Sequence, residues 1–172
     1  MSFSHPCSEP RCSAAHDDGD IDTWLAREDA RTEAVIKSHG WMVQAVFGDG
    51  PGSPDLAYTV GLWGLNHPEI VVFGVPVDTS HPLLNDLGER VRSGVTLRPG
   101  DVLSFGPWPH RVHLLAVPHP ERVLFQATRT YGRPVPALQA VWDDLGGRFP
   151  WEEGYAAPRW LQPLPDSPSW RA

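Results

Sequence analysis

The sequence predicts a single α+β domain with a mainly antiparallel sheet and two main helices. Two apolar runs, LAYTVGLW (56–63) and EIVVFGV (69–75), are rich in the branched and aromatic residues typical of strands, and a short turn at 64–68 joins them. Helical patterns separate some of the other strand-like runs, which favours the α+β class. Five or six strands can also curl into a partly closed or split barrel of the kind that often holds a flavin, an analogy that rests on element order alone.

The first predicted elements are a helix and a strand. The helix runs from about residue 21 to about residue 38, with Asp20 or Asp22 as its cap and Gly40 at its end. Its apolar face is incomplete, so we expect it to cover an edge or a face of the sheet rather than cross the core. A strand is predicted over 41–47, and the Gly- and Pro-rich segment 48–54 is predicted as a loop.

The strongest helical pattern follows the central strand pair. Four apolar residues recur on one helical face: Leu83, Leu84, Leu87 and Val91. Thr79 or Ser80 suits the cap, Pro82 suits the first turn, and Gly94 suits the end. We therefore expect this helix to pack against the sheet as part of the core.

The C-terminal half alternates short strands with breaks. Strands are predicted over 101–105 and 110–117, and the pattern over 122–130 fits either a strand or a helix. A short helix is predicted over 136–145, with Asp143 and Asp144 at its end, followed by an irregular Pro- and Trp-rich stretch. We expect one globular domain over 20–163, flanked by a poorly ordered tail at 1–19 and a second tail at 164–172.

Length, charge and hydropathy narrow the function classes. A chain of 172 residues is long enough for one domain with a substantial core. The formal net charge of −7 opposes nucleic-acid binding, which needs a basic surface. No run of about 20 apolar residues predicts a membrane span, and no basic-then-apolar leader precedes the domain, so we expect a cytoplasmic protein.

Metal-ligand residue types gather near the N-terminus. His5, Cys7, Cys12 and His16 supply four zinc-type ligands within a short span. No packed element surrounds them in the sequence, so we expect a tail without bound metal rather than a zinc site. His110 and His113 lie three apart on a predicted strand and point to opposite faces, so they could share a metal only through a bulge.

Several segments resemble one known family. YTVGLW, HPEIVVFGVP, LLNDLGERVRSG and LQAVWDDLGGRFPWEEGY are similar to motifs of the bacterial domain of unknown function 4262 family, and the likeness extends from about residue 40 to about residue 163. The resemblance implies a small soluble bacterial domain. It implies no reaction and no substrate, so it assigns no catalytic residue.

Polar residues on the central strand pair mark a candidate pocket wall. Tyr58, Thr59, Trp63 and Trp151 are candidate ligand-binding residues. His67 and Glu69 are two positions apart and could form an acid–base pair or hold a metal. In the alternative interpretation, the His67 segment only reverses the chain and Glu69 caps that turn.

Two function hypotheses remain open at this point. One is a small-molecule-binding protein with or without enzymatic activity, for which flavin or zinc is an open cofactor choice. The other is a protein-interaction or immunity-type module without catalysis, favoured by the acidic charge and the Trp-rich C-terminal part. The sequence contains no phosphate-binding Gly-rich loop, no G-x-S-x-G motif and no H-E-x-x-H motif, which disfavours the corresponding hydrolase classes.

Overall fold

The computed structural model describes residues 18–165. Its elements are α1 (Asp18–His39), β1 (Met42–Val46), β2 (Leu56–Val60), η1 (Leu62–Leu65), β3 (Glu69–Phe73), α2 (Val77–Arg92), β4 (Val102–Ser104), β5 (Arg111–Ala116), η2 (Pro120–Arg122), α3 (Phe125–Tyr131), β6 (Ala137–Trp142) and η3 (Arg159–Leu161), where η denotes a short 3-10 helix. The strands form one six-stranded sheet in the order β1-β2-β3-β6-β5-β4. All neighbours are antiparallel except β3 and β6, which are parallel, so the predicted α+β class is confirmed.

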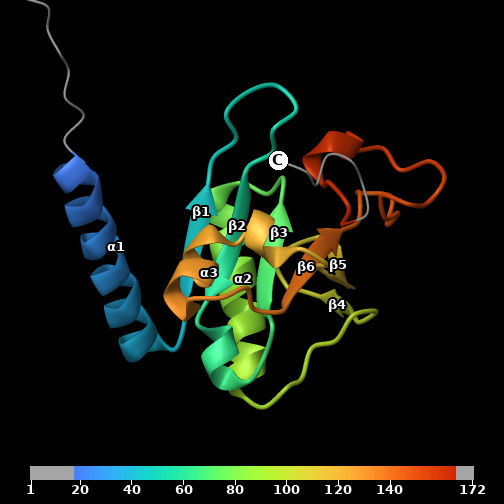
Figure 1. The fold of residues 1–172 in the computed structure, drawn as a ribbon. Coiled ribbons are helices and arrows are strands. Elements are labelled where there is room, and N and C mark those ends of the chain that lie inside the picture. The colour runs from blue at the N-terminus through green and yellow to red at the C-terminus, as the bar shows by residue number, and fades with distance from the viewer. Residues whose placement is uncertain (1–17, 166–172) are drawn as a thin grey trace, which may run out of the picture.

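The sheet is open, so the barrel suggested by element order is wrong. Two antiparallel units of three strands, β1–β2–β3 and β6–β5–β4, lie side by side and join at the parallel β3–β6 pair (Figure 1). Strands β1 and β4 lie at opposite ends of the strand order, and each pairs with one neighbour. A closed barrel would require β1 to pair with β4, whereas in the described sheet β1 pairs with β2 and β4 pairs with β5 alone.

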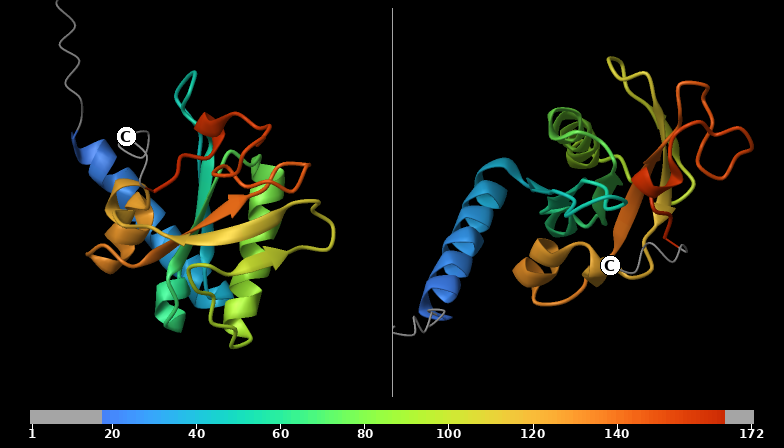
Figure 2. Two further views of the ribbon diagram at one scale, coloured as in Figure 1. Left: turned by 90° about the vertical axis from the view of Figure 1, so that its right-hand side faces the viewer. Right: turned by 90° about the horizontal axis from the view of Figure 1, so that it is seen from above.

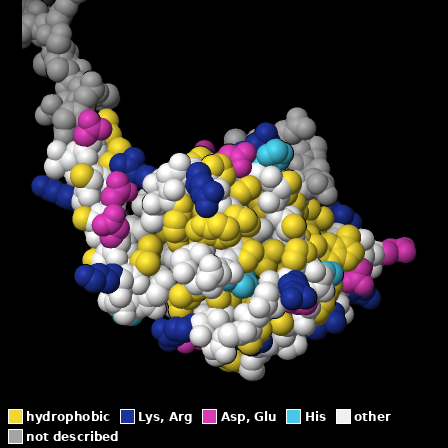
Figure 3. All heavy atoms as spheres, turned by 60° about the horizontal axis from the view of Figure 1, so that its bottom comes forward, with side chains coloured by type: hydrophobic (Ala, Val, Ile, Leu, Met, Phe, Trp, Pro, Cys, Tyr) yellow, Lys and Arg dark blue, Asp and Glu magenta, His cyan; other side chains and the backbone are white. Residues whose placement is uncertain are grey.

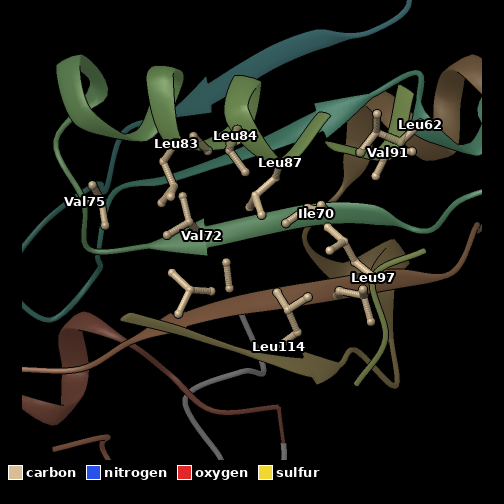
Figure 4. Close-up of a cluster of buried hydrophobic side chains, with 14 of the residues drawn as sticks. Leu62, Ile70, Val72, Val75, Leu83, Leu84, Leu87, Val91, Leu97 and Leu114 are labelled. Carbon is tan, nitrogen blue, oxygen red and sulfur yellow. The ribbon is translucent and has the colours of Figure 1, made fainter. Parts of the chain in front are cut away.

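Helix α2 covers one face of the sheet and α3 covers the other (Figure 2). The helical face predicted from the sequence, Leu83 to Val91, packs on Ile70 and Val72 of β3 and on Leu114 of β5 (Figure 4). Leu84 and Leu87 have no exposed surface, which confirms that this face of α2 belongs to the core. The hydrophobic effect of these leucines therefore fixes α2 on the sheet.

A second hydrophobic cluster lies beneath α3, on the opposite face. Tyr58 and Val60 of β2 pack there with Val71 of β3 and Ala127 of α3. Ala57 lies between Leu56 and Tyr58 in the sequence, but its side chain belongs to the α2 cluster on the other face. Alternation along β2 therefore sends consecutive side chains into two separate cores.

The segment 136–145 is not a helix but contains strand β6, which corrects the prediction. β6 lies between β3 and β5, and five of its six residues are buried. A run that is apolar on both faces has no period of two, so its spacing could not distinguish a buried strand from a buried helix. Asp143 and Asp144 consequently follow a strand end rather than a helix end.

Helix α2 also begins earlier than predicted. It starts at Val77, after Pro76, which supplies no side-chain cap, so neither Thr79 nor Ser80 is the cap. Pro82 lies inside the helix instead of in its first turn. Its missing N–H leaves the carbonyl of the exposed residue Asp78 without an intrahelical partner, and solvent can satisfy that carbonyl. The segment 122–130, which fitted two structures, contains α3.

After β6 the chain folds back over the sheet where β3 and β6 diverge. Their parallel pairing extends only to Val71 and Gln139. Beyond that point the Gln162 side chain accepts a hydrogen bond from Trp142 N and donates one to Trp142 O, each at 2.8 Å. A side-chain amide thus replaces the missing strand neighbour and holds the C-terminal segment in place.

Helix α1 projects from the body of the domain (Figure 1). Its attachment includes an ion pair of 2.7 Å between Asp29 and Arg129 of α3. In the space-filling view, hydrophobic side chains gather in a band across the body, with basic and acidic groups around it (Figure 3). Within residues 18–165, no helix has the length and hydrophobicity needed to cross a membrane.

Candidate functional site

Glu69 is fully buried, and its carboxylate organises the connection between β2 and β3. Its oxygens accept hydrogen bonds from the Thr59 hydroxyl at 2.6 Å and from the backbone N–H of Gly61 at 2.8 Å, Trp63 at 3.1 Å and Leu62 at 3.3 Å. The Thr59 hydroxyl oxygen also accepts a hydrogen bond from Ile70 N, so the hydroxyl hydrogen is left to donate to Glu69. The arrangement matches the structural alternative from the sequence, in which Glu69 caps the turn.

Burial governs the titration of this cluster. Removal from water raises the pKa of Glu69, and the hydrogen bonds from Thr59 and from the three backbone amides oppose that rise. Burial, together with the nearby Glu69 charge, raises the pKa of Tyr131 to about 12, so this phenol stays protonated and can donate to Glu69. Every described neighbour of the carboxylate is a donor, which leaves no lone pair directed at an open space.

His67 is buried and has partners for both ring nitrogens. Leu97 N donates to Nε2 at 3.1 Å, so the hydrogen of the neutral ring resides on Nδ1, which donates to Pro68 O at 2.7 Å. The ring thereby connects the turn before β3 to the loop after α2. His67 and Glu69 have separate partners and do not form an acid–base pair.

The other predicted site residues lie apart from one another. Tyr58 OH accepts a hydrogen bond from Gln126 N under α3, and Trp63 faces the Arg133 guanidinium at 5.8 Å. Trp151 stacks on Phe149 with a centroid distance of 5.1 Å. None of the cavities described below is lined by Tyr58, Thr59, Trp63 or Trp151. These four residues therefore do not converge on any of the described cavities, and their role in ligand binding stays a prediction.

A cavity of about 440 Å³ lies between α2 and the β4–β5 connection. We call it the outer groove; its lining residues are Asp78, Thr79, Pro82, Leu83, Asp86, Phe105, Pro107 and Trp108. Its volume and its apolar, aromatic walls are typical of small-molecule sites.

A smaller cavity of about 120 Å³ adjoins the outer groove and shares Thr79 and Trp108 with it. We call it the inner cavity; its lining residues are Gly74, Val75, Pro76, Thr79, Trp108, His110 and Trp142. It lies after the C-terminal end of β3, at the start of α2 and beside the last residue of β6. In open sheets, the C-terminal ends of parallel strands are a common place for ligand sites.

His110 is held firmly in the wall of the inner cavity. Its Nδ1 lies 2.5 Å from the carbonyl oxygen of Asp143, and its ring lies between Trp108 and Trp142 at centroid distances of 4.9 and 5.3 Å. A carbonyl oxygen can only accept, so Nδ1 carries a hydrogen and Nε2 of the neutral ring has a free lone pair. Within residues 18–165, no hydrogen-bond partner of Nε2 is described.

Asp143 supports His110 from behind. Its carboxylate lies 3.7 Å from His110 Nδ1 and accepts hydrogen bonds of 2.7 Å from both the backbone N–H and the Nε of Arg111. The adjacent Asp144 accepts from the backbone amides of Arg148 and Ala156, and these bonds lower the pKa of Asp144. The two aspartates therefore hold the loop after β6 and orient the histidine.

Sequence reasoning had no means to pair His110 with Asp143. The two residues are 33 positions apart, and their contact depends on the β5–β6 register, in which Val112 faces Trp142. The WPH sequence at 108–110 was the available signal, because a histidine beside a tryptophan in a tight connection can line a pocket. His113, by contrast, contacts Phe149 and Trp151, so the two histidines have different surroundings.

Metal ligation has no candidate in the described part of the chain. The structure describes no group of three or more His, Cys, Asp or Glu side chains placed to hold an ion within residues 18–165. The predicted candidates His5, Cys7, Cys12 and His16 lie outside the described residues. The flavin analogy loses its structural basis because the sheet does not form a barrel.

A third cavity, of about 730 Å³, separates α1 from the edge strand β1. Charged residues of both signs line it, among them Glu28, Arg31, Glu89 and Arg92. Small-molecule sites are mostly apolar. The outer groove therefore has the more apolar lining, although the cavity beside α1 is larger.

Comparison with known proteins places the domain in one family. A model of the domain of unknown function DUF4262 matches residues 35–156, which include β1 to β6 and all residues of the outer groove and inner cavity. No curated protein and no solved structure gave a match. Because the family model covers most of its length, the chain belongs to the DUF4262 family.

Proposed function

We propose that this protein binds a small organic molecule in the outer groove and inner cavity, and that His110 forms a hydrogen bond with this molecule or transfers a proton to or from it. The observation that carries the proposal is the orientation of His110. Its Nδ1 is committed to Asp143 O, while Nε2 has no described partner and the ring lines a cavity. Gln139 Oε1 is the one buried side-chain polar atom without a partner among the described residues, so Nε2 of His110 is open to water or to a ligand in the cavity.

The surroundings of His110 suit acid–base chemistry. Histidine changes charge near neutral pH, and general acids and bases work best in that range. The Asp143 carboxylate lies 3.7 Å from Nδ1, so a carboxylate stands beside the ring whose other nitrogen is free. The enzymatic part of the proposal is therefore proton transfer at Nε2 to or from the bound molecule.

A ligand-observed NMR screen of small fragments tests the binding part, with two pairs of matched variants. His110→Gln and Trp108→Leu alter the cavities, whereas His113→Gln and Trp151→Leu alter the same residue types beside Phe149. We expect fragments that bind the wild type to lose binding in the first pair and keep it in the second. The opposite pattern, or fragment binding that is unaffected by all four substitutions, would place the binding site elsewhere.

The acid–base part needs a separate measurement. The affinity of a hit should change across the pH range in which histidine titrates, and His110→Gln should remove that change while His113→Gln keeps it. A pH profile that is unaltered by His110→Gln would remove His110 from the mechanism and leave only a binding cavity.

Self-association is the second candidate function, and the cavity beside α1 favours it. That cavity presents acidic and basic groups together, and a patch with both signs can face its own copy across a twofold axis. Arg31→Glu should then shift sedimentation towards monomer, whereas Lys37→Glu, on the same helix and outside the cavity lining, should not. A wild type that remains monomeric at high concentration would reject this function.

A further inference from the structure

The outer groove has a charge pattern that narrows the class of its ligand. Two aspartates, Asp78 and Asp86, line it together with two aromatic rings, and its lining contains no Lys or Arg. We infer that the groove binds an organic cation, an ammonium group on a small apolar body, with the cation between Asp78 and Trp108. This inference rests on the proposed function, because it names the ligand class of the same site.

The protein itself supplies the template for such a site at one end of the groove. Arg90 Nε donates to the Asp86 carboxylate at 2.6 Å, and the Arg90 guanidinium lies 5.0 Å from the centroid of the Phe105 ring. Asp86 and Phe105 both line the groove. A carboxylate and an aromatic face thus already hold one cation together, through charge and through the ring quadrupole.

The other end of the groove repeats these components without a cation of its own. Asp78, Pro82 and Asp86 are spaced by four residues along α2, so they lie on one helical face, with the two carboxylates about 12 Å apart along the axis. Trp108 and Asp78 both line the groove, as do Phe105 and Asp86. Tryptophan is the best of the aromatic residues for binding a cation.

Distances between these groups fit a ligand with an apolar body. Pro82 and Leu83 form an uncharged stretch of lining between the two carboxylates. The Phe105 and Trp108 rings meet edge to face at 6.2 Å and form a continuous aromatic wall opposite the helix. A cationic head at Asp78 and a carbon chain directed along this wall would use both halves of the groove.

An anionic ligand is disfavoured even though the groove includes the start of α2. Helix N-termini attract negative charge, and the first turn of α2 has no side-chain cap. Asp78 already places a carboxylate in that turn, and it would repel a second anion, whereas the charge of Asp86 is balanced by Arg90. The local charge therefore favours a positive ligand over a phosphate or carboxylate.

Choline and its uncharged isostere 3,3-dimethylbutan-1-ol form the matched probe pair, with affinities measured by isothermal titration calorimetry on the full chain. We expect choline to bind about tenfold more tightly, in the range given by charge and cation–π contacts, and to weaken as salt is raised. Asp78→Asn should remove the preference and leave the alcohol affinity unchanged. Asp49→Asn, an exposed carboxylate in the 48–54 loop, should change neither.

The outcomes separate this inference from the proposed function. Equal affinities for choline and the alcohol, both lost in Trp108→Leu, would overturn the cation class and keep the small-molecule site. If neither probe binds but the binding of fragment hits depends on His110, the cation class is likewise overturned and the small-molecule site is kept. If no probe and no fragment binds in a way that depends on Trp108 or His110, both the inference and the proposed function are wrong.

Discussion

Replacing Glu69 by alanine should destabilise the fold by about 2–4 kcal/mol, because it removes the acceptor for several buried donors. The Gly61 and Trp63 amides, at 2.8 and 3.1 Å from the carboxylate, have no other described acceptor. Two unsatisfied buried amides cost about 1–3 kcal/mol each. Relief from burying a carboxylate offsets part of this sum, which gives the lower total.

Glu69→Gln is the informative companion. The amide oxygen can still accept from Gly61 and Trp63, so the loss falls on the bonds to the other oxygen, from the Thr59 hydroxyl at 2.6 Å and from Leu62 N at 3.3 Å. We expect a cost of about 0.5–1.5 kcal/mol for glutamine. Glu153→Ala, at an exposed position, serves as the control and should stay within about 0.5 kcal/mol of the wild type.

Urea unfolding followed by circular dichroism measures these differences. If alanine proves too unstable to purify, hydrogen exchange at Gly61 and Trp63 in the glutamine variant still reports on the same bonds. A loss below about 1 kcal/mol in Glu69→Ala would refute the structural role, as would a larger loss for glutamine than for alanine.

Three further outcomes are expected. Leu84→Ala should cost about 2–5 kcal/mol in urea unfolding because Leu84 of α2 is completely buried against the sheet, and a loss below about 1 kcal/mol would contradict that packing. Gly74→Ala should speed proteolysis after residue 155, because a Cβ at position 74 would lie 2.5 Å from the carbonyl oxygen of Leu161. Gly132→Ala is the control, because Gly132 has the same φ of 66° but open space around its Cβ position. Equal proteolysis rates in the two variants would exclude the clash at Leu161. In an absorbance titration at 295 nm, native protein should show less tyrosinate at about pH 10.5 than protein unfolded in urea, because burial raises the pKa of all three tyrosines and that of Tyr131 to about 12. The folded state then keeps protons that the unfolded state loses, so the free energy of unfolding should fall as pH rises above about 10, and a native titration identical to that in urea would contradict the burial.

The sequence indicated most of the elements but not how distant segments meet. Helix α2 was predictable because Leu83 to Val91 follow one period and one face. Strand β6 was not, since burial on both faces removes the alternation that identifies a strand. The same strand joins the two halves of the sheet, so the missed element is also the one that sets the topology.

The candidate site shows a similar division. Polar residues on the central strands were singled out correctly as unusual, and the structure uses Thr59, His67 and Glu69 to bind backbone groups of the turn and the following loop. His110 is a histidine like His67, but the sequence around it gives a weaker indication of a site. What distinguishes it is a free ring nitrogen, which depends on long-range contacts with Asp143 and Trp142 that no local spacing encodes.

The Gln162 side chain that pairs with Trp142 has a consequence for synthesis on the ribosome. Chains emerge from the N-terminal end, so β3 and β6 can pair before Gln162 is available. Until then the Trp142 backbone groups and the buried Gln139 lack the partners that Gln162 and Pro163 provide. The last step of folding should therefore wait for a few residues beyond the matched family region, and a released chain truncated after residue 156 should have a nearly complete sheet with an open seam at its centre.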